Sequence, residues 1–569
     1  MKTKVSVTFG LYDTTAKTDS SLTATSKQDW VDLTELQREE QLEPLCYGDL
    51  EHNYWLLDDS REVLPNQPTN LDLGLWSTVI SDGSGVFAVP PELRIDFLTA
   101  VHSSIGLTFR FYEPTGDYCS LLNIAWYGEE DNLLKAGDYE INSPSFFVAE
   151  KILDYKKIVI TFKKTSLPYR FVKLTGIEFG EKITWSDRDL TEGHMREQLD
   201  LSGSSLSINT LNFTVCADDE RFDIYNPQGV YEVLQERQAI KVQRYSDGKE
   251  LDSSTFYLNS WEEANANPAK LEAYDLIGLL DTVNYHGDLF NGYLSQALIA
   301  DILDTAGVPY MLDTTLENIE IHGWLPQCSC REALANVLFA VGAAADCSRS
   351  DKIKIYPLVL TDAEPETLPM SRQAFEQETK QYKAVTGVEL KAHSYKIKSG
   401  AEVSDIYEED FDELGTVNVD FSEPHDVYKV TSGNAVIEKK WAAGMVLRVT
   451  QTGTVTVSGW KYDDNVETLG YYRALKAGEK ENLVTTDIDC TLISKRNAKA
   501  VAERLYNYYL NRYELNLEIL QQSETVGQTL RFENLRQKQF VGFAEELDID
   551  LCGGFVAQGR FVGTMREAE

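Results

Sequence analysis

The sequence predicts a multidomain protein that is mainly β, with α+β parts. The chain has 569 residues, which is more than one hydrophobic core organises, so we expect about three to five domains. It contains 29 Tyr and 23 Phe, residue types that favour strands over helices. Apolar and polar residues alternate along many short segments that are bounded by Gly, Pro, Asn and Asp, as in half-buried strands.

Strand patterns fill the first half of the chain. Residues 4–11 alternate between apolar and polar side chains and predict a half-buried strand. Between about residues 76 and 183 one strand pattern follows another without a helix pattern, which is typical of a β-sandwich. We therefore expect residues 61–185 to form the sandwich, with residues 1–60 and 186–262 forming the two parts of a first β domain.

Helix patterns appear after residue 262, where we expect an α+β domain over residues 263–372. Pro268 stands at a position suited to the first turn of a helix, and Gly307 is suited to ending the next one. Ser329 and Glu332 have the S-x-x-E spacing of a capping box, and an apolar stripe follows them.

The last two hundred residues return to strand patterns. We expect a β domain over residues 373–485. A helix capped by Ser494 and several strands then complete a second β domain over residues 486–569.

The chain is strongly acidic, with a formal net charge of −38. This argues against a surface that grips nucleic acid, and it would repel a polyanion moving past. No stretch reaches the roughly 20 apolar residues of a membrane helix, and no secretory signal is visible. The eight cysteines are scattered, which favours reduced thiols made in a cytoplasm.

Three cysteines, Cys328, Cys330 and Cys347, lie close together in the sequence and raise the question of a metal or redox site. A zinc site prefers two ligand pairs of the C-x2-C kind, whereas this pair is C-x-C and no second pair lies near. Packed thiols around a capped helix are therefore the favoured interpretation, and metal binding and redox chemistry are the weaker ones. We expect neither a metal nor a cofactor.

Enzyme signatures are missing from the sequence. The histidines are far apart, and we find no G-x-S-x-G elbow, Walker A loop or G-x-G-x-x-G. Adjacent carboxylates are common, but 91 acidic residues make that a matter of composition. We interpret these carboxylates as solvated faces and expect no catalytic residues; they are Asp58, Asp59, Glu129, Glu130, Asp131 and the acidic run at 408–413.

Aromatic side chains gather in the sandwich region. Trp126 and Tyr127 end one strand pattern, where a loop would present them, and Trp55 lies upstream. Aromatic faces stack on sugar rings. These three residues are thus candidates for carbohydrate binding, although a role in the core is the stronger interpretation.

The order of the parts resembles that of baseplate hub or tail-tip proteins of tailed phages and phage-derived particles. "GLWSTVISDGSGVFAVPPELRIDF" resembles the opening of a galactose-binding-like sandwich. "LSINTLNFTVCADDERFDIYNPQG" resembles the first barrel of a tail hub, and "ALIADILDTAGVPY" the helix–strand unit that follows it. "FVGFAEELDIDLCGGFVAQGRFVGT" is similar to the closing strands, so the resemblance covers most of the chain.

The resemblance implies a structural virion protein. It implies two β-barrel domains similar to the tail-tube fold, a homotrimeric ring that joins the tail tube to the tip, and an inserted sandwich that binds host glycan or a partner protein. Partners would be tail-tube, distal tail and baseplate proteins, with DNA passing through the lumen without specific contacts. Some relatives carry a cell-wall hydrolase at the C-terminus, and we expect none here. The alternatives are a carbohydrate-binding adhesin and a cell-wall hydrolase.

Overall fold

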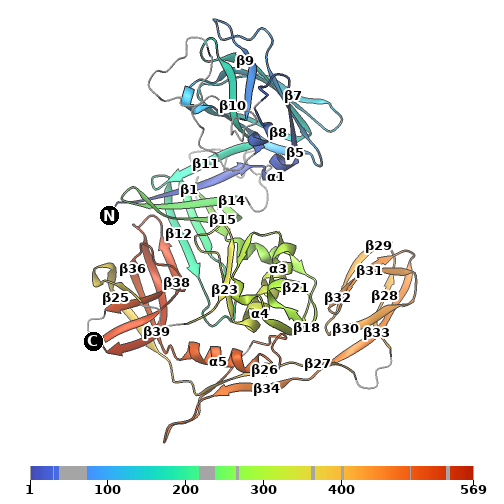
Figure 1. Ribbon diagram of the computed structural model, residues 1–569, viewed down its shortest axis with the longest axis vertical. Coiled ribbons are helices and arrows are strands. Elements are labelled where there is room, and N and C mark those ends of the chain that lie inside the picture. Colours follow the sequence, from blue (N-terminus) through green and yellow to red (C-terminus); the bar gives the residue numbers. More distant parts are fainter. Residues whose placement is uncertain are drawn as a thin grey trace.

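The computed structural model describes residues 2–29, 31–37, 51, 74–216, 238–263, 268–360, 365–398, 403–486, 488–533 and 538–567. Figure 1 shows a β-sandwich at the top, a large sheet below it, an α+β unit at the centre and a β-rich arm to the right. The predicted fold class is confirmed, because strands arranged in several separate sheets dominate the chain. Within the described ranges, no helix has the length and apolar character needed to cross a membrane.

In the described part of the chain, thirteen strands from both ends of the sequence form the large sheet. Its hydrogen-bonded path runs in the order β11 (Gly180–Ser186), β1 (Thr3–Tyr12), β14 (Ala239–Ser246), β15 (Lys249–Glu263), β16 (Pro268–Tyr274), β13 (Thr210–Cys216), β12 (Leu190–Gln198), β38 (Lys538–Asp550), β39 (Val556–Glu567), β36 (Tyr513–Leu520) and β25 (Gln373–Gln381). Two further strands, β24 (Glu366–Leu368) and β37 (Thr529–Glu533), pair beside β38.

An N-terminal and a C-terminal set of strands meet where β12 pairs with β38. Met195 lies opposite Ile549 at this seam, and neither residue is exposed. One hydrophobic core contains residues of both sets. The two sets therefore fold as one continuous sheet over a shared core.

The sandwich is an insertion between β1 and β11. These strands are antiparallel neighbours, and Tyr12 lies directly opposite Gly180. One sandwich sheet consists of β3 (Leu75–Ile80), β10 (Phe171–Glu178), β5 (His102–Phe111) and β8 (Ser145–Tyr155). The other consists of β2 (Ser20–Ala24), β4 (Glu92–Phe97), β9 (Lys157–Thr165), β6 (Cys119–Tyr127) and β7 (Leu133–Glu140).

The structure corrects the expected sandwich boundaries of 61 and 185. β2 pairs with β4, so this N-terminal strand belongs to the sandwich and not to the first β domain. β11 pairs with β1 and belongs to the large sheet. The sequence around β2 is polar and its apolar alternation is short, which is why the pattern did not reveal the strand.

A buried histidine fastens the sandwich to its point of entry. Asp13 follows β1 and caps α1 (Thr14–Asp19) by accepting hydrogen bonds from the first backbone N–H groups of that helix. His102 places Nδ1 2.6 Å from Asp13 Oδ2 and Nε2 2.9 Å from Asp19 Oδ2. Hydrogen bonds to both carboxylates raise the pKa of His102 against the opposing effect of burial. The backbone N–H of Asp13 also donates to Phe179 O, which ties the two chain crossings together.

The α+β unit confirms two of the predicted helix ends and overturns a third prediction. α3 (Ser295–Ala306) ends at Gly307, whose φ of 66° is left-handed. α4 (Cys330–Val341) begins at Ser329, whose side chain accepts a hydrogen bond from the Glu332 N–H. Pro268, by contrast, opens the strand β16, because β13 and β15 pair with that segment on both sides. The first helix of the unit is the short α2 (Leu276–Leu279).

Small sheets surround these helices. They contain β17 (Asn284–Tyr285) with β21 (Cys328–Ser329), β18 (Asp288–Leu294) with β20 (Glu320–Leu325), and β19 (Tyr310–Leu312) with β23 (Ile353–Pro357) and β22 (Ala343–Asp346).

A stem sheet and an arm follow. The stem sheet is β34 (Glu467–Tyr472), β26 (Gly387–Ala392) and β35 (Leu483–Thr485), and α5 (Ala498–Tyr509) packs on it. The arm contains β28 (Ser404–Phe411), β29 (Gly415–Asp420), β30 (His425–Ser432), β31 (Ala435–Trp441), β32 (Gly444–Val449) and β33 (Gly453–Asp464), and β27 (Tyr395–Ile397) pairs with the end of β33. Ser494 makes no side-chain cap for α5, which begins three residues later than expected; Asn497 occupies the cap position.

Arg349 joins three parts of the molecule through a buried ion cluster. It lies in the turn between β22 and β23, with a left-handed φ of 52°. Its guanidinium donates to both carboxylate oxygens of Glu197 on β12, at 2.9 and 3.0 Å, and lies 3.3 Å from Asp252 on β15. It also donates to Glu524 O in the segment after β36. One side chain thus connects the α+β unit to both strand sets.

Two more arginines complete the cluster. Arg244 is fully buried and pairs with Asp252, and Arg372 pairs with Glu524 at 2.5 Å. Three guanidinium groups therefore face three carboxylates, and each charge has a partner. Buried charges are tolerated when they are paired and hydrogen-bonded in this way.

Candidate functional site

Trp126, predicted as a carbohydrate-binding residue, is fully buried on β6. It packs in the sandwich core, and its indole ring meets that of Tyr139 edge-on with centroids 6.0 Å apart. A ring without exposed surface has no face to offer a sugar. The functional interpretation is wrong for this residue, and the core interpretation is the one that the structure supports.

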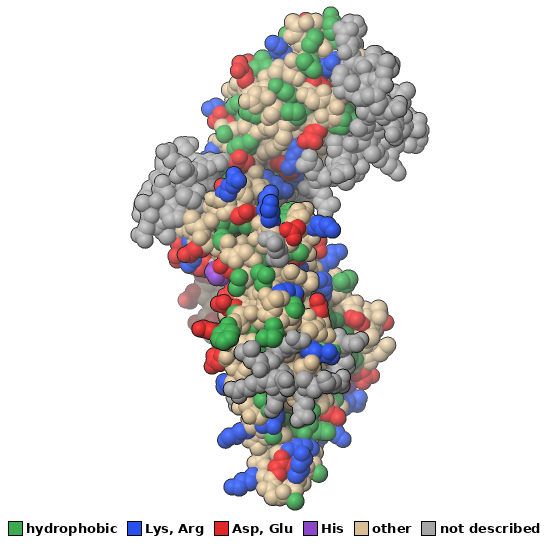
Figure 2. Space-filling view, turned by 90° about the vertical axis from the view of Figure 1, so that its left-hand side faces the viewer, with side chains coloured by type: hydrophobic (Ala, Val, Ile, Leu, Met, Phe, Trp, Pro, Cys, Tyr) green, Lys and Arg blue, Asp and Glu red, His purple; other side chains and the backbone are tan. Residues whose placement is uncertain are grey.

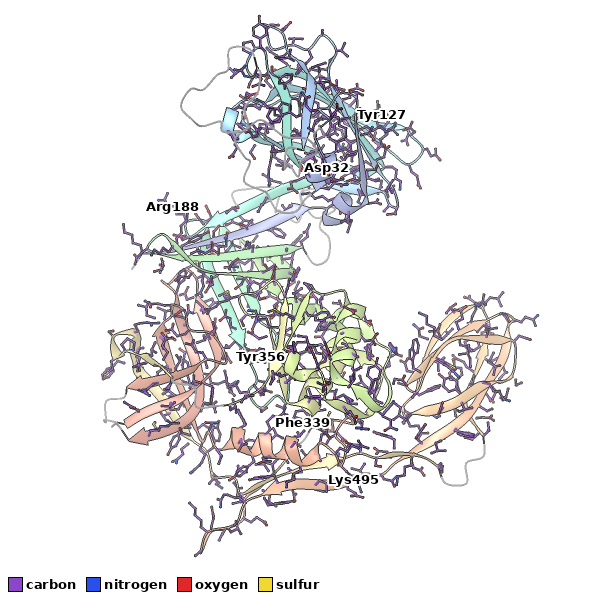
Figure 3. All side chains as sticks on the ribbon, in the orientation of Figure 1. Asp32, Tyr127, Arg188, Phe339, Tyr356 and Lys495 are labelled. Carbon is purple, nitrogen blue, oxygen red and sulfur yellow. The ribbon has the colours of Figure 1, made fainter. Side chains whose placement is uncertain are left out.

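The other two predicted residues do not join it. Tyr127 is half-buried at the outer side of the sandwich, as Figure 3 shows, and the ammonium group of Lys157 lies 4.1 Å from the centroid of its ring. That cation–π contact covers one face of the ring. Trp55 lies outside the described residues. Trp126 and Tyr127 are sequence neighbours on one strand, and alternation points their side chains to opposite faces.

The cysteines are packing residues, as expected. Cys330 and Cys347 are buried in the core of the α+β unit, and Cys328 packs against the same core. Burial raises the pKa of Cys328 to about 12 and that of Cys330 to about 11, so these thiols stay protonated near neutral pH. A group of three or more metal-ligating side chains does not occur in the described part of the chain.

The carboxylate runs lie on the surface where they are described. Glu129, Glu130 and Asp131 are exposed in the turn after β6, where Asp131 forms an ion pair with Lys157. The acidic run at 408–413 lies on and after β28 with its side chains largely exposed. Asp58 and Asp59 lie outside the described residues. The solvated-face interpretation fits the carboxylates that the structure places.

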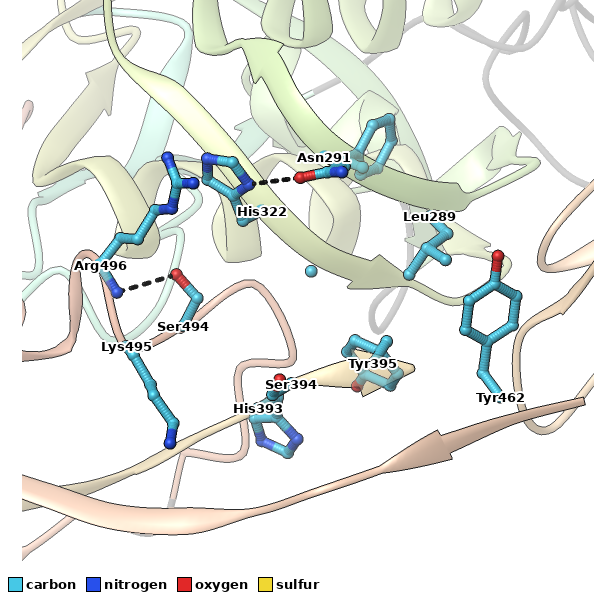
Figure 4. Close-up of a pocket in the computed structure, with 12 residues that line it drawn as sticks. Leu289, Asn291, His322, His393, Ser394, Tyr395, Tyr462, Ser494, Lys495 and Arg496 are labelled. Atoms are coloured by element: carbon cyan, nitrogen blue, oxygen red, sulfur yellow. Dashed lines mark hydrogen bonds between the residues drawn. The ribbon is translucent and has the colours of Figure 1, made fainter. Parts of the chain in front are cut away.

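The strongest candidate site is a cleft that sequence reasoning missed. It is a hollow of about 460 Å³ between the β18–β20 ribbon of the α+β unit, the β27–β33 base of the arm, and the loop before α5. Figure 4 shows this arrangement, with the ribbon above the hollow and β27 below it. Its walls are formed by Leu289, Phe290, Asn291, His322, Gly323, His393, Ser394, Tyr395, Tyr462, Ser494, Lys495 and Arg496.

Two histidines are fixed in the walls. His393 is buried, with Nδ1 2.7 Å from Asp464 Oδ2 and Nε2 3.0 Å from Asp489 Oδ1. His322 lies 3.1 Å from Asn291 Oδ1 and 3.3 Å from Glu320 Oε2. Both imidazoles are oriented by two partners, so the walls hold a defined shape.

Two cations stand at the rim of the cleft. Lys495 Nζ lies 2.6 Å from Glu467 Oε1, and Arg496 Nη1 lies 3.4 Å from Glu320 Oε2. Their side chains are 56% and 70% exposed. Lys495 extends below α5 in Figure 3, at the base of the arm. Exposed pairs of this kind contribute about 0–1 kcal/mol and exchange partners readily.

The arm meets the α+β unit beside this cleft. The His286 and Trp441 rings have centroids 4.5 Å apart, and the Ala442 N–H donates to Asp288 Oδ1 at 2.9 Å. Burial lowers the pKa of His286, so the ring is neutral at pH 7. These contacts set the width of the cleft, because they hold the arm against the ribbon that forms its upper wall.

Comparison with known proteins yields similarities of structure and none of sequence. No family model matches the chain, and no curated protein matches it. Solved structures similar to it include a tail protein from Neisseria meningitidis, with 8% identity and a TM-score of 0.39 over 66% of this chain and 92% of that one. A prophage MuSo2 43 kDa tail protein from Shewanella oneidensis has 8% identity and a TM-score of 0.38 over 67% and 95%. The prophage tail protein gp18 from Listeria monocytogenes has 8% identity and a TM-score of 0.38 over 68% and 91%.

Proposed function

We propose that this chain is a structural protein of a phage tail or a phage-derived particle, and that it forms a homotrimeric hub at the tail tip. The observation that carries the proposal is the continuous large sheet, in which β12 and β38 join two strand sets and leave β11 and β25 as the ends of the path. Strand edges with unpaired backbone groups are templates for pairing with another chain. A head-to-tail contact between two different edges closes into a ring when it is repeated around an axis.

The edge at β25 has the character of a contact surface. Side chains on both faces of this strand are largely exposed, and Phe375 is 85% exposed. A large apolar side chain in this position favours burial against a partner. A second copy of the chain is the partner in this proposal, and tail-tube and distal tail proteins would stack on the resulting ring.

The charge of the chain supports a passive channel. The face in Figure 2 mixes acidic and basic side chains without a broad basic patch, and the net charge is −38. Counterion release from phosphates, which drives non-specific DNA binding, requires clustered Lys and Arg. DNA would therefore pass such a hub without being held, and the chain would act without catalysis.

Oligomeric mass is the direct test. We expect a three-chain mass at micromolar concentration in mass photometry, and a shift to monomer for Phe375→Asp because the new charge would be buried at the contact. Leu133→Asp on β7 is the matched control, since Leu133 is also an exposed apolar residue on an edge strand but belongs to the sandwich. A wild-type chain that stays monomeric would contradict the hub proposal.

For the sandwich we propose contact with a host glycan or a partner protein through the loops farthest from the large sheet. Val86, Val89 and Leu167 are exposed on these loops and Ile80 is exposed at the end of β3, and the Thr165 N–H donates a hydrogen bond to Gly85 O between the loops. A glycan array probed with the full chain tests the glycan branch. Binding that Val89→Asp abolishes and Leu133→Asp leaves intact would support it, and an empty array would leave the protein partner as the proposal.

A further inference from the structure

We propose that the cleft at the base of the arm binds an acidic sugar, a pyranose that carries a carboxylate, either free or at the end of a polysaccharide. The proposal concerns a site separate from the ring contacts and from the sandwich. Three features carry it: the two cations in the lining, the weak ion pairs in which they take part, and the aromatic side chains inside.

Two cations are the charged groups that a ligand in the cleft meets first. The lining includes Lys495 and Arg496 and, as far as the structure describes it, no aspartate or glutamate. The carboxylates that pair with them, Glu467 and Glu320, contact them from outside the lining. An anionic ligand reaches both cations directly, so the rim favours an anion.

The rim cations are available to a ligand. Among the side chains that the structure describes, Arg496 forms one ion pair, a 3.4 Å contact to the half-exposed Glu320, and Lys495 pairs with the similarly exposed Glu467. Replacing these weak pairs by a ligand carboxylate costs little. The planar guanidinium fork of Arg496 suits a carboxylate, which accepts two parallel hydrogen bonds.

The interior suits a flat ring with hydroxyl groups. Phe290, Tyr395 and Tyr462 contribute aromatic surface. The Tyr395 ring lies nearly parallel to that of His393, with an interplanar angle of 8°, which fixes its orientation. Aromatic faces stack on the C–H faces of pyranoses, and Ser394 and Ser494 offer hydroxyls to the ring oxygens. The volume of about 460 Å³ lies within the usual range for small-molecule sites.

Glucuronate is the probe. Glucose, which lacks the carboxylate, and acetate, which lacks the sugar ring, are the two control ligands. Calorimetric titration of the full chain is expected to give saturable glucuronate binding in the millimolar range or tighter, about tenfold tighter than for either counterpart. A glucuronate-ended oligosaccharide distinguishes the two sources, because a polysaccharide end would bind at least as tightly as the free sugar. The proposal would be overturned if glucose or acetate bound with the same affinity as glucuronate. It would also be overturned if glucuronate binding did not saturate by roughly 20 mM.

Variants locate the binding. Arg496→Gln is expected to weaken glucuronate binding about tenfold and to leave the weak glucose affinity unchanged, because it removes a charge-assisted contact. Tyr462→Ala is expected to weaken both sugars. Arg188→Gln is the matched control, since Arg188 is an exposed arginine in the turn between β11 and β12, far from the cleft in Figure 3. An equal loss for Arg188→Gln and Arg496→Gln would mean general charge attraction and would refute the site.

Discussion

Arg349 and Arg496 both form ion pairs with carboxylates, but the two pairs differ in how far solvent reaches them. Arg349 is largely buried, with its side chain 11% exposed, and it contacts Glu197, Asp252 and the backbone of Glu524 in a cluster whose charges all have partners. Arg496 has one long contact to Glu320 at the rim of an open hollow, and its side chain is 70% exposed. The first arrangement holds parts of the fold together, whereas the second leaves a cation ready for another partner.

Solvent access decides between the two roles. Removing one member of a buried pair leaves the other charge without water or a partner, which is strongly destabilising. Removing one member of an exposed pair returns the other to water at little cost. The measurements below separate these cases, from the largest expected effect to the smallest.

Arg349→Met is expected to lower the free energy of unfolding by about 3–5 kcal/mol, because it leaves the buried Glu197 carboxylate without its cationic partner, whereas Asp252 keeps Arg244. Urea unfolding followed by tryptophan fluorescence measures this change in the transition of the large sheet. Arg496→Met is the control and is expected to change stability by less than about 0.5 kcal/mol. If both variants lost the same free energy of unfolding, the distinction between a structural and an available arginine would be wrong.

His102→Gln is expected to cost about 2 kcal/mol in the sandwich at pH 5–6.5, since it removes hydrogen bonds to charged partners. The raised pKa of His102 means that its contribution is complete below its usual value of 6.5 and is lost as the pH rises through the raised value. The pKa values of Asp13 and Asp19 are lowered, so their contribution is lost as the pH falls below about 4.

The measurement is the thermal midpoint of wild type and His102→Gln from pH 3 to 9. The difference between the two should be largest near pH 5–6.5 and should shrink toward both ends. Tyr155 also packs near His102, and its raised pKa keeps it neutral throughout this range. A difference that grew with rising pH would contradict the charged clamp.

The smallest effect is expected at the rim. A double-mutant cycle on Lys495→Gln and Glu467→Gln should give a coupling energy of about 0.5 kcal/mol or less, vanishing in 1 M salt. The same cycle on Arg349 and Glu197 should retain most of its coupling in that salt. A rim coupling above about 1 kcal/mol would mean that Lys495 is fixed in its pair and is a poor ligand contact.

The elements that the sequence predicted well are those whose determinants are local. Ser329 and Glu332 are three residues apart, and the cap they predicted is present. The strand pattern of the sandwich was equally readable. Pro268 was misjudged because strand pairing with segments about fifty residues upstream outweighs the local preference. For Trp126 the sequence favoured a core role over carbohydrate binding, and its burial agrees with the favoured interpretation.

The candidate site was beyond the sequence for the same reason. Asn291, His322, Tyr395, Tyr462 and Arg496 come from segments spread over more than two hundred residues, and no motif links them. Arg349 likewise meets Glu197 across 152 positions. Only the packing of separate units brings such groups together.

The pairing of Tyr12 with Gly180 makes the inserted sandwich easy to exchange for another domain in evolution. None of the strands described between residues 13 and 179 belongs to the large sheet, which resumes at Gly180 directly opposite Tyr12. A turn of two residues is enough to bridge neighbouring antiparallel strands. Exchange of the sandwich as a unit therefore preserves the strand ladders of the large sheet. Among the described residues, the sheet would lose chiefly the apolar contacts of Ile105 and Phe147 and the hydrogen bond from Thr108 Oγ1 to Gly180 O.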